Sequence, residues 1–380
     1  MKRKKPVTLL VPGARVARSR LSRLLIDFDW GLLFLVVLIS SIGLANLYSA
    51  TYATPHSVKY DQQVIWMLLG FTCYFFFSFV NYKNWERWTW AGHIAVIVAI
   101  LAVRFFFEAV KGSQRWIMLG PIRIQPTELA KLAVILSLAR LLADWDDEKF
   151  TLKTIAPYIA VLLLPILLVA WQPDLGSASL LGLIILSVSL MLVKTLWPIF
   201  LTMLAGLVVL PLFWETMEPY QRGRVLAFLD PGADPTGAAW QTSQSVKAIG
   251  SGQISGKGYM EATQNHFNFL PEHWTDFPFS VWAEEWGFLG SAGMLLVFLL
   301  LVLWIVNVAL NAKNKFGQAI CLGVAAMVFW HTLVNILMVT GWAPVVGVPL
   351  PLISYGGSSV LTMLSGLGLV SSVSRRHRID

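Results

Sequence analysis

Two short stretches of this chain place ionisable side chains directly before or inside apolar runs. The segment NFLPEHWTDFPF (residues 268–279) places Glu272 and Asp276 among tryptophan and phenylalanine rings, directly before an apolar run. A carboxylate in such surroundings can have its pKa raised and take up a proton, which is general-base chemistry. In the segment IQPTELAKLA, Glu128 and Lys131 are spaced i, i+3, so a helix would bring them together on one face. Ionisable residues inside a membrane span are costly and are by default functional candidates.

Each of these side chains also has a structural interpretation. Glu128 and Lys131 could form an ion pair that only holds a helix bundle together. Asp276 could cap the helix that follows it, since aspartate is a favoured N-cap residue. Pro278 is favoured at the first helical position, however, so we expect Phe277 to be the cap and Asp276 to lie just outside the helix.

Three further polar residues are more readily explained by structure than by chemistry. Asp174 follows a proline and is interpreted as a turn or cap residue near the start of a helix. His331 and Asn335 are four residues apart and share one face of a predicted span. A histidine and an asparagine alone make no metal site, so we interpret both as partners in hydrogen bonds between helices.

The composition is that of a membrane protein. Of 380 residues, 56% are apolar and 13% are charged, whereas a soluble domain carries about a quarter charged residues. About ten apolar windows have the length needed to cross about 30 Å of hydrocarbon, which predicts an all-α polytopic membrane protein with about ten spans. The eighth window is long enough to include interfacial or cytoplasmic turns. The windows lie at about 30–50, 63–80, 90–109, 127–143, 155–171, 176–193, 196–214, 279–310, 317–340 and 356–374.

Lysine and arginine predict the orientation of the chain. The net charge is +8 and both ends are basic. Because cytoplasmic segments are enriched in these residues, we place both termini in the cytoplasm. The predicted organisation is a basic cytoplasmic tail at 1–29, a single transmembrane domain at 30–374 and a second basic tail at 375–380. We interpret the tails as topology signals and expect no binding to nucleic acid.

One connection between predicted spans is much longer than the others. It covers about 215–279, on the outer face between the seventh and eighth windows, and loops of that length are usually functional or disordered. Its aromatic residues and short glycine motifs favour an ordered outer cap. The polar segments 111–131, 171–178 and 341–359 are also predicted on the outer side. Irregular backbone at membrane depth needs protein or water to satisfy it, so we expect these segments to surround a cavity open to that side.

Several cations are predicted on the outer side, where the charge bias of membrane proteins disfavours them in short loops. Arginine binds phosphate through bidentate hydrogen bonds, so we expect phosphate-binding residues among them, with a solvated loop charge as the alternative for each. Trp116 could stack on a sugar or anchor the interface. The cations are Arg115, Arg222, Arg224, Lys247 and Lys257.

Five segments in register make the chain resemble the SEDS family of bacterial cell-wall proteins, in particular its RodA branch. They are GSQRWI, IQPTELAKLA, QPDLGSA, the large outer loop and GVPLPLISYGGSS. The resemblance implies a multi-pass enzyme of the bacterial cytoplasmic (inner) membrane. It would polymerise lipid II into β-1,4-linked peptidoglycan strands during cell elongation and rod-shape maintenance. The implied partners are a class B penicillin-binding protein, which cross-links the strands, and other proteins of the elongation complex.

The resemblance also implies residue roles. Asp276 corresponds to the aspartate that the family needs for polymerisation, and Trp116, Glu128 and Lys131 match its QRW and QPSELAK motifs. Glu272 and the outer cations join them as candidate substrate-binding residues. The family has histidine directly before its Thr-Asp pair, where this chain has Trp274, so no role that needs this imidazole is carried over.

The implied reaction turns an α-linked donor into a β-linked product, so the configuration inverts and one base is needed. We assign the role of that base to Asp276. We expect the outer cations to bind the pyrophosphate leaving group and stabilise its negative charge. The sequence assigns no definite cofactor, and help from a divalent cation, Mg²⁺ or Mn²⁺, in holding the pyrophosphates is left open. A lipid II flippase, an FtsW-type division polymerase and a non-catalytic scaffold are the alternative functions.

Overall fold

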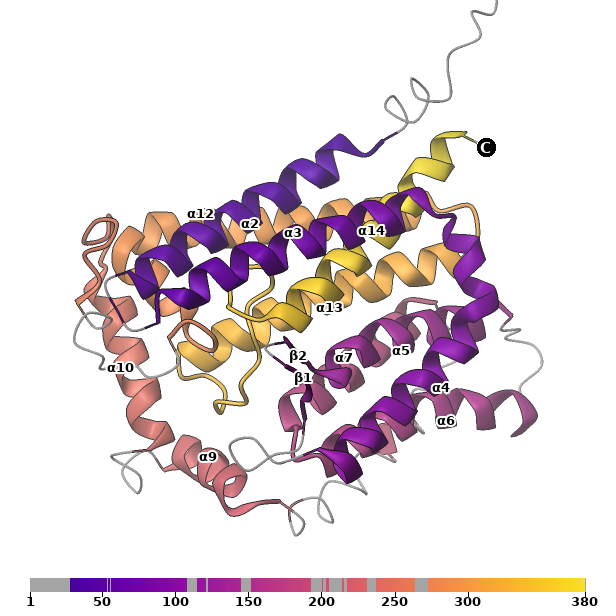
Figure 1. Ribbon diagram of the computed structural model, residues 1–380, viewed down its shortest axis with the longest axis horizontal. Helices are drawn as coiled ribbons and strands as arrows, with labels where there is room; N and C mark the ends of the chain where they lie inside the picture. Colours follow the sequence, from indigo (N-terminus) through magenta and orange to yellow (C-terminus); the bar gives the residue numbers. More distant parts are fainter. Residues whose placement is uncertain are drawn as a thin grey trace, which may run out of the picture.

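Helices account for nearly all regular structure in the computed structural model (Figure 1). It describes residues 28–52, 54, 56–107, 115–120, 122–144, 152–192, 200, 203–204, 214, 217–230, 237–263 and 273–379. Strands β1 (Ile117–Leu119) and β2 (Ile122–Ile124) form an antiparallel hairpin in which Met118 pairs with Arg123. The helices are α2 (Trp30–Thr51), α3 (Val58–Phe79), α4 (Tyr82–Phe106), α5 (Pro126–Ala143), α6 (Leu152–Trp171), α7 (Leu175–Leu192), α9 (Pro219–Leu229), α10 (Ala238–Ser251), α12 (Pro278–Leu310), α13 (Lys315–Val339) and α14 (Gly357–Ile379).

Seven of the described helices are long and apolar enough to cross a membrane, namely α2, α3, α4, α7, α12, α13 and α14. In α14, 83% of the apolar window is buried, against 28% in α3 and 22% in α4. Apolar surface left exposed on a long helix is suited to contact with lipid. The bundle is therefore built around α14, with α3 and α4 facing outward, as in a multi-pass membrane protein.

Nearly every predicted apolar window coincides with a described helix. The exception, at about 196–214, lies almost entirely outside the described residues, so the prediction of ten spans is not tested there. The long eighth window coincides with α12, and the expectation that it includes interfacial or cytoplasmic turns stays a prediction. Helix α12 is interrupted by a kink at Gly287, whose φ of 64° is non-helical. A Cβ at Gly287 would lie 2.3 Å from the backbone nitrogen of Gly256, so this bend requires glycine.

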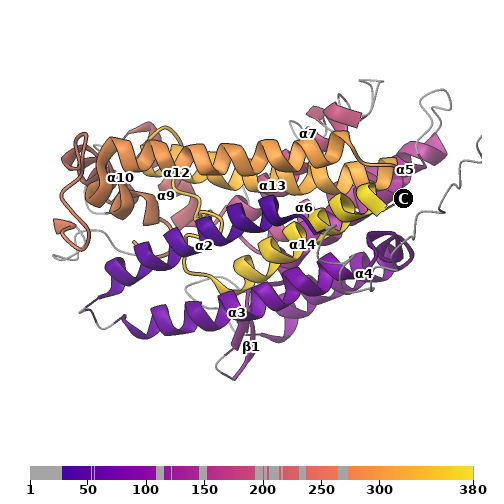
Figure 2. The same cartoon turned by 90° about the horizontal axis from the view of Figure 1, so that it is seen from above.

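The two ends of the bundle are distinct (Figures 1 and 2). Asp29 caps α2 through a hydrogen bond from the backbone of Leu32 and accepts a 2.5 Å hydrogen bond from the Ser374 hydroxyl near the end of α14. The start of α2 and the end of α14 therefore lie at the same end, as an even number of spans requires. Helices α9 and α10 lie at the other end.

The segment between α13 and α14 is irregular and yet partly inside the bundle. Val348, Leu350 and Ile353 in it are buried. Its backbone groups are satisfied by protein, since Gln63 Nε2 donates to the carbonyl of Ser354 at 3.1 Å. This is the condition under which irregular backbone is tolerated at membrane depth.

Candidate active site

A cavity of about 340 Å³ lies where several helices begin. The first turns of α5, α7 and α14 and the turn before α12 all border it. A helix N-terminus carries partial positive charge and unpaired N–H groups, so this convergence favours an anionic ligand. Six of the candidate residues line the cavity: Arg115, Trp116, Glu128, Lys131, Arg224 and Asp276.

Asp276 closes a four-residue turn that leads into α12. Phe277 is the N-cap of that helix and Pro278 follows at its first position, so Asp276 lies just outside the helix, as the sequence predicted. The side chain of Asp276 lines the cavity. Its backbone carbonyl accepts a 3.0 Å hydrogen bond from Asn335 Nδ2. The structure thus fixes the main chain of Asp276 and leaves its carboxylate facing the cavity.

Glu128 and Lys131 form the ion pair that their spacing predicted. Lys131 Nζ lies 2.7 Å from Glu128 Oε1, and the two residues are 1% and 4% exposed respectively. The same ammonium lies 2.8 Å from His331 Nε2 on α13. Both members of the pair line the cavity, so a cation that is largely shielded from bulk water faces the ligand space.

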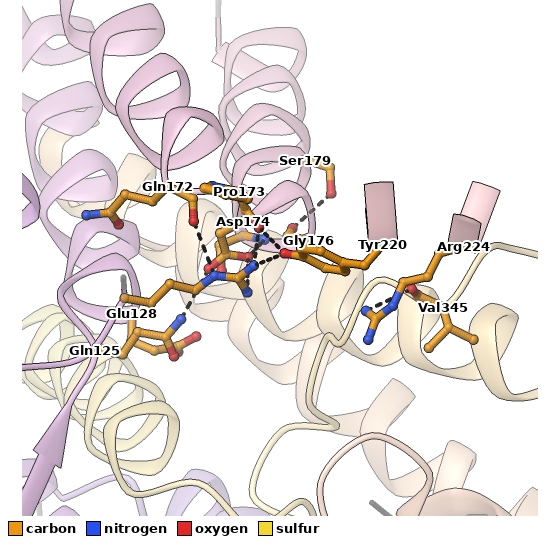
Figure 3. A network of polar contacts seen from close by, with 12 residues as sticks. Gln125, Glu128, Gln172, Pro173, Asp174, Gly176, Ser179, Tyr220, Arg224 and Val345 are labelled. Atoms are coloured by element: carbon orange, nitrogen blue, oxygen red, sulfur yellow. Dashed lines mark hydrogen bonds and ion pairs between the residues drawn. The ribbon is translucent and has the colours of Figure 1, made fainter. Parts of the chain in front are cut away.

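Arg115 is held by the loop between α6 and α7, whose residues Gln172, Pro173 and Asp174 are labelled in Figure 3. Its Nε donates to the carbonyl of Gln172 at 3.3 Å, one Nη donates to the carbonyl of Pro173, and the other lies 3.6 Å from Asp174 Oδ1. Tyr220 on α9 reaches the same group, and its hydroxyl accepts a 2.9 Å hydrogen bond from Arg115. This network orients the guanidinium at the cavity wall.

Arg224 reaches the cavity from α9 and donates to the carbonyl of Val345 at 3.2 Å. Next to it, Gly347 adopts a φ of 71°. A Cβ at Gly347 would lie 3.8 Å from Arg224 Nη1 and 3.8 Å from Asp276 Oδ2. A cation and the proposed base therefore both lie close to this glycine, at one part of the cavity wall.

The tryptophan that departs from the family pattern packs away from the cavity. Lys59 Nζ lies 3.5 Å from a ring centroid of Trp274, a cation–π contact, and the His56 ring lies 4.2 Å from the Trp274 ring. His273 Nε2 lies 3.0 Å from the carbonyl oxygen of Ala50. Neither Trp274 nor His273 lines the cavity, so both fix the turn rather than contact the ligand space.

Three of the predicted phosphate-binding cations lie elsewhere. Lys257 pairs with the buried Glu284 at 2.5 Å, which ties the loop after α10 to α12. Lys247 on α10 is exposed and lines a separate cavity of about 430 Å³. Arg222 does not line the main cavity, although Arg224, two residues along α9, does. Glu272 lies outside the described residues.

The sequence favoured a structural role over a chemical one for one residue of the cavity wall, Asp174. Asp174 does cap α7, since Ser177 N donates to Asp174 Oδ1 at 3.1 Å. It also lines the cavity and accepts a 3.2 Å hydrogen bond from Gln125 Nε2 through its other oxygen. The sequence signal that could have indicated this role is the QPDLGSA segment, in which Gln172 and Pro173 directly precede Asp174.

Two tyrosines also line the cavity and carried no local sequence signal. Tyr220 acts through Arg115, more than a hundred positions away. Burial raises the pKa of Tyr355, and Arg123 opposes the rise. Its phenol therefore stays protonated at neutral pH and donates to Gln62 Oε1 at 2.6 Å.

The described residues bring together no group of three or more histidine, cysteine, aspartate or glutamate side chains that could hold a metal ion. Magnesium is commonly held by one or two carboxylates together with waters and substrate phosphates, and the carboxylates that line this cavity are Glu128, Asp174 and Asp276. The protein's own positive charges at the cavity are Arg115, Lys131 and Arg224.

Comparison with known proteins places this geometry in a family. A family model described as cell cycle protein, FtsW/RodA/SpoVE, matches residues 24–379. The chain belongs to the FtsW/RodA/SpoVE family. The predicted family resemblance is thereby confirmed, and with it a multi-pass protein of the bacterial inner membrane.

Relatives within the FtsW/RodA/SpoVE family share much of the chain. The peptidoglycan glycosyltransferase MrdB of Escherichia coli K12 is 41% identical over 298 residues, covering 78% of this chain and 80% of MrdB. The peptidoglycan glycosyltransferase RodA of Treponema pallidum is 31% identical and covers 92% of this chain and 98% of that protein.

Solved structures agree with the family. A chain from a peptidoglycan synthase complex, in which polymerization and crosslinking are coordinated, superposes with a TM-score of 0.78 at 32% identity, over 93% of this chain and 99% of that one. The rod shape determining protein RodA of Thermus thermophilus superposes with a TM-score of 0.70 at 29% identity, over 93% and 98%.

Proposed function

We propose that this protein is a peptidoglycan glycosyltransferase that polymerises lipid II during cell elongation. The activity is that of the named relatives MrdB and RodA. The relatives MrdB and RodA and the structural neighbour from a peptidoglycan synthase complex favour the elongation role over division. The observation that carries the proposal is the meeting of Asp276 with Arg115, Lys131 and Arg224 at one cavity.

The reaction assigns a different task to each charge. The acceptor's 4-hydroxyl attacks the anomeric carbon of the donor sugar, and Asp276 takes the hydroxyl proton as the new bond forms. The bond from that carbon to the pyrophosphate breaks on the opposite side, so the configuration inverts. The leaving group departs as an anion, which needs positive charge more than a proton. Arg115, Lys131 and Arg224 supply that charge from the cavity wall.

The location of the cavity suits a lipid-linked substrate. Asp276 precedes α12 at the end of the bundle opposite Asp29, where α2 begins. With basic tails in the cytoplasm, this end faces outward, and the head group of a polyprenyl-linked sugar lies just beyond the outer leaflet. Ten spans, an outer loop at about 215–279 and the domain limits 1–29, 30–374 and 375–380 complete the proposed topology.

A cross-linking partner is part of the proposal. The structural neighbour from a peptidoglycan synthase complex supports a class B penicillin-binding protein as the membrane partner, together with other elongation proteins. The weakly buried faces of α3 and α4 offer apolar surface within the bilayer.

The decisive experiment is polymerisation of lipid II by purified protein in detergent. Detergent leaves no two compartments, so a flippase would give no glycan product there. We expect polymer from the wild type and a loss of about 10² to 10³-fold or more in Asp276→Asn, which keeps the shape of the side chain and removes its basicity. A wild type that forms no polymer, with or without the partner, would refute the proposed function.

A further inference from the structure

Helix α13 carries two buried polar side chains one turn apart. His331 is 1% exposed and Asn335 is 0% exposed, and their neighbours on the helix are largely apolar. Polar side chains inside a span are costly unless they are hydrogen-bonded, and they mark functional positions more often than chance. Neither residue lines the cavity itself. Their roles therefore depend on the cavity residues to which they are hydrogen-bonded.

His331 holds Lys131 through a fixed tautomer. Its Nδ1 lies 2.7 Å from the carbonyl oxygen of Met327, which can only accept, so Nδ1 carries the proton. The lone pair of Nε2 is then directed at the Lys131 ammonium, 2.8 Å away. Lys131 has three N–H donors. One serves Glu128, one serves His331, and the third remains for the cavity that Lys131 lines.

Asn335 holds the main chain at two points of the cavity wall. Its Nδ2 donates to the carbonyl of Asp276 at 3.0 Å and to the carbonyl of Val348 at 2.8 Å. Both N–H groups of the amide are therefore used. The first bond fixes the turn that carries the proposed base. The second fixes the segment around Gly347, which lies close to both Asp276 and Arg224.

We propose that His331 and Asn335 are a pair of positioning residues. One turn of α13 sets the distance between the Lys131 cation and the Asp276 base and holds both for the displacement. The proposal rests on the polymerase function. Its physical basis is that transition-state contacts tolerate little error, since a misplacement of about 1 Å can cost about 10²-fold in rate. Both residues act through others and contact no reacting atom.

The test for His331 compares two substitutions in the detergent polymerisation assay. His331→Gln keeps an oxygen that can accept from Lys131, whereas His331→Leu fills similar space with no acceptor. We expect His331→Leu to lower kcat by about 10- to 100-fold while KM for lipid II stays within about threefold. His331→Gln should retain most of the turnover.

A matched control is available in the same membrane environment. His93 on α4 is also buried and lies 3.1 Å from the hydroxyl of Ser137, but it does not line the cavity. His93→Leu should leave kcat unchanged. Equal losses in His93→Leu and His331→Leu would show that any buried histidine matters for the fold alone and would overturn the proposal.

Asn335→Asp tests the second half, because it keeps the shape and removes both N–H donors, and even a protonated carboxyl can donate to only one of the two carbonyls. We expect a similar fall in kcat at nearly constant KM. A folded Asn335→Asp or His331→Leu with wild-type kcat would overturn the pairing. If His331→Leu does not fold, His331→Gln alone remains decisive, since a folded Gln variant with 100-fold lower kcat contradicts the acceptor argument. A wild type without activity would instead reject the polymerase function.

Discussion

Removing the cation of the buried Glu128–Lys131 pair should destabilise the protein by a predictable amount. Lys131→Met leaves the carboxylate of Glu128, 4% exposed, without the ammonium 2.7 Å away. Breaking a buried pair by deleting one partner costs about 3–5 kcal/mol, because a buried charge is left uncompensated. His331 Nε2 also loses its donor, and an unsatisfied buried acceptor costs about 1–3 kcal/mol, which overlaps with the first loss.

A double variant separates the cost of the unpaired Glu128 carboxylate from the cost of the unpaired His331 acceptor. Replacing both charges, as Glu128→Met with Lys131→Met, removes the stranded carboxylate, and apolar replacement of a buried pair is often neutral or stabilising. Only the stranded imidazole of His331 should then remain, at about 1–3 kcal/mol. The double variant is therefore expected to be more stable than the single Lys131→Met variant, although it carries one more substitution.

Stability and catalysis should separate in the same set of variants. Equilibrium unfolding in mixed detergent micelles measures the free energy of unfolding, and lipid II polymerisation measures turnover. The double variant should regain stability but remain at least about 10²-fold slower than the wild type, because the cavity has lost a preorganised cation. A Lys131→Met variant as stable as the wild type, or a double variant with near-normal turnover, would refute this reasoning.

Three further substitutions test other parts of the site. Gly347→Ala puts an L residue at a φ of 71°, so we expect about 1–2 kcal/mol lower stability and slower turnover, whereas unchanged turnover would contradict a constrained wall there. Lys257→Met removes the ammonium from the buried carboxylate of Glu284, which keeps its hydrogen bonds from Thr263, so stability should fall by about 1–3 kcal/mol in unfolding experiments, with KM for lipid II largely kept. A raised KM would instead support the predicted role of Lys257 in substrate binding. Arg115→Lys cannot reproduce the fork that reaches Asp174 and two carbonyls, so KM should rise about tenfold or more, and a normal KM would reject a phosphate role.

Local patterns in the sequence predicted the features that depend on nearby residues. The apolar windows predicted the helices, and the i, i+3 spacing predicted the Glu128–Lys131 pair. The proline at the first position of α12 placed Asp276 outside the helix. Each of these is decided within one or two turns of chain, where periodicity and capping preferences operate.

Contacts between distant segments could not be predicted in the same way. Lys257 looked like a free outer cation, but its partner Glu284 lies on another element and binds it at 2.5 Å. Asp174 was assigned to capping, and only the fold brings Arg115 to it. The interhelical role expected for His331 was right in kind, yet no local signal identified Lys131, 200 positions away, as its partner.

The most direct test of Asp276 as the catalytic base is the rate of lipid II polymerisation by purified Asp276→Asn compared with the wild type in detergent, both shown to be folded. If this assignment is right, the wild type forms glycan polymer and the variant is at least about 10²-fold slower, since an amide cannot accept the hydroxyl proton. An Asp276→Asn protein that polymerises lipid II at a near-normal rate would contradict it.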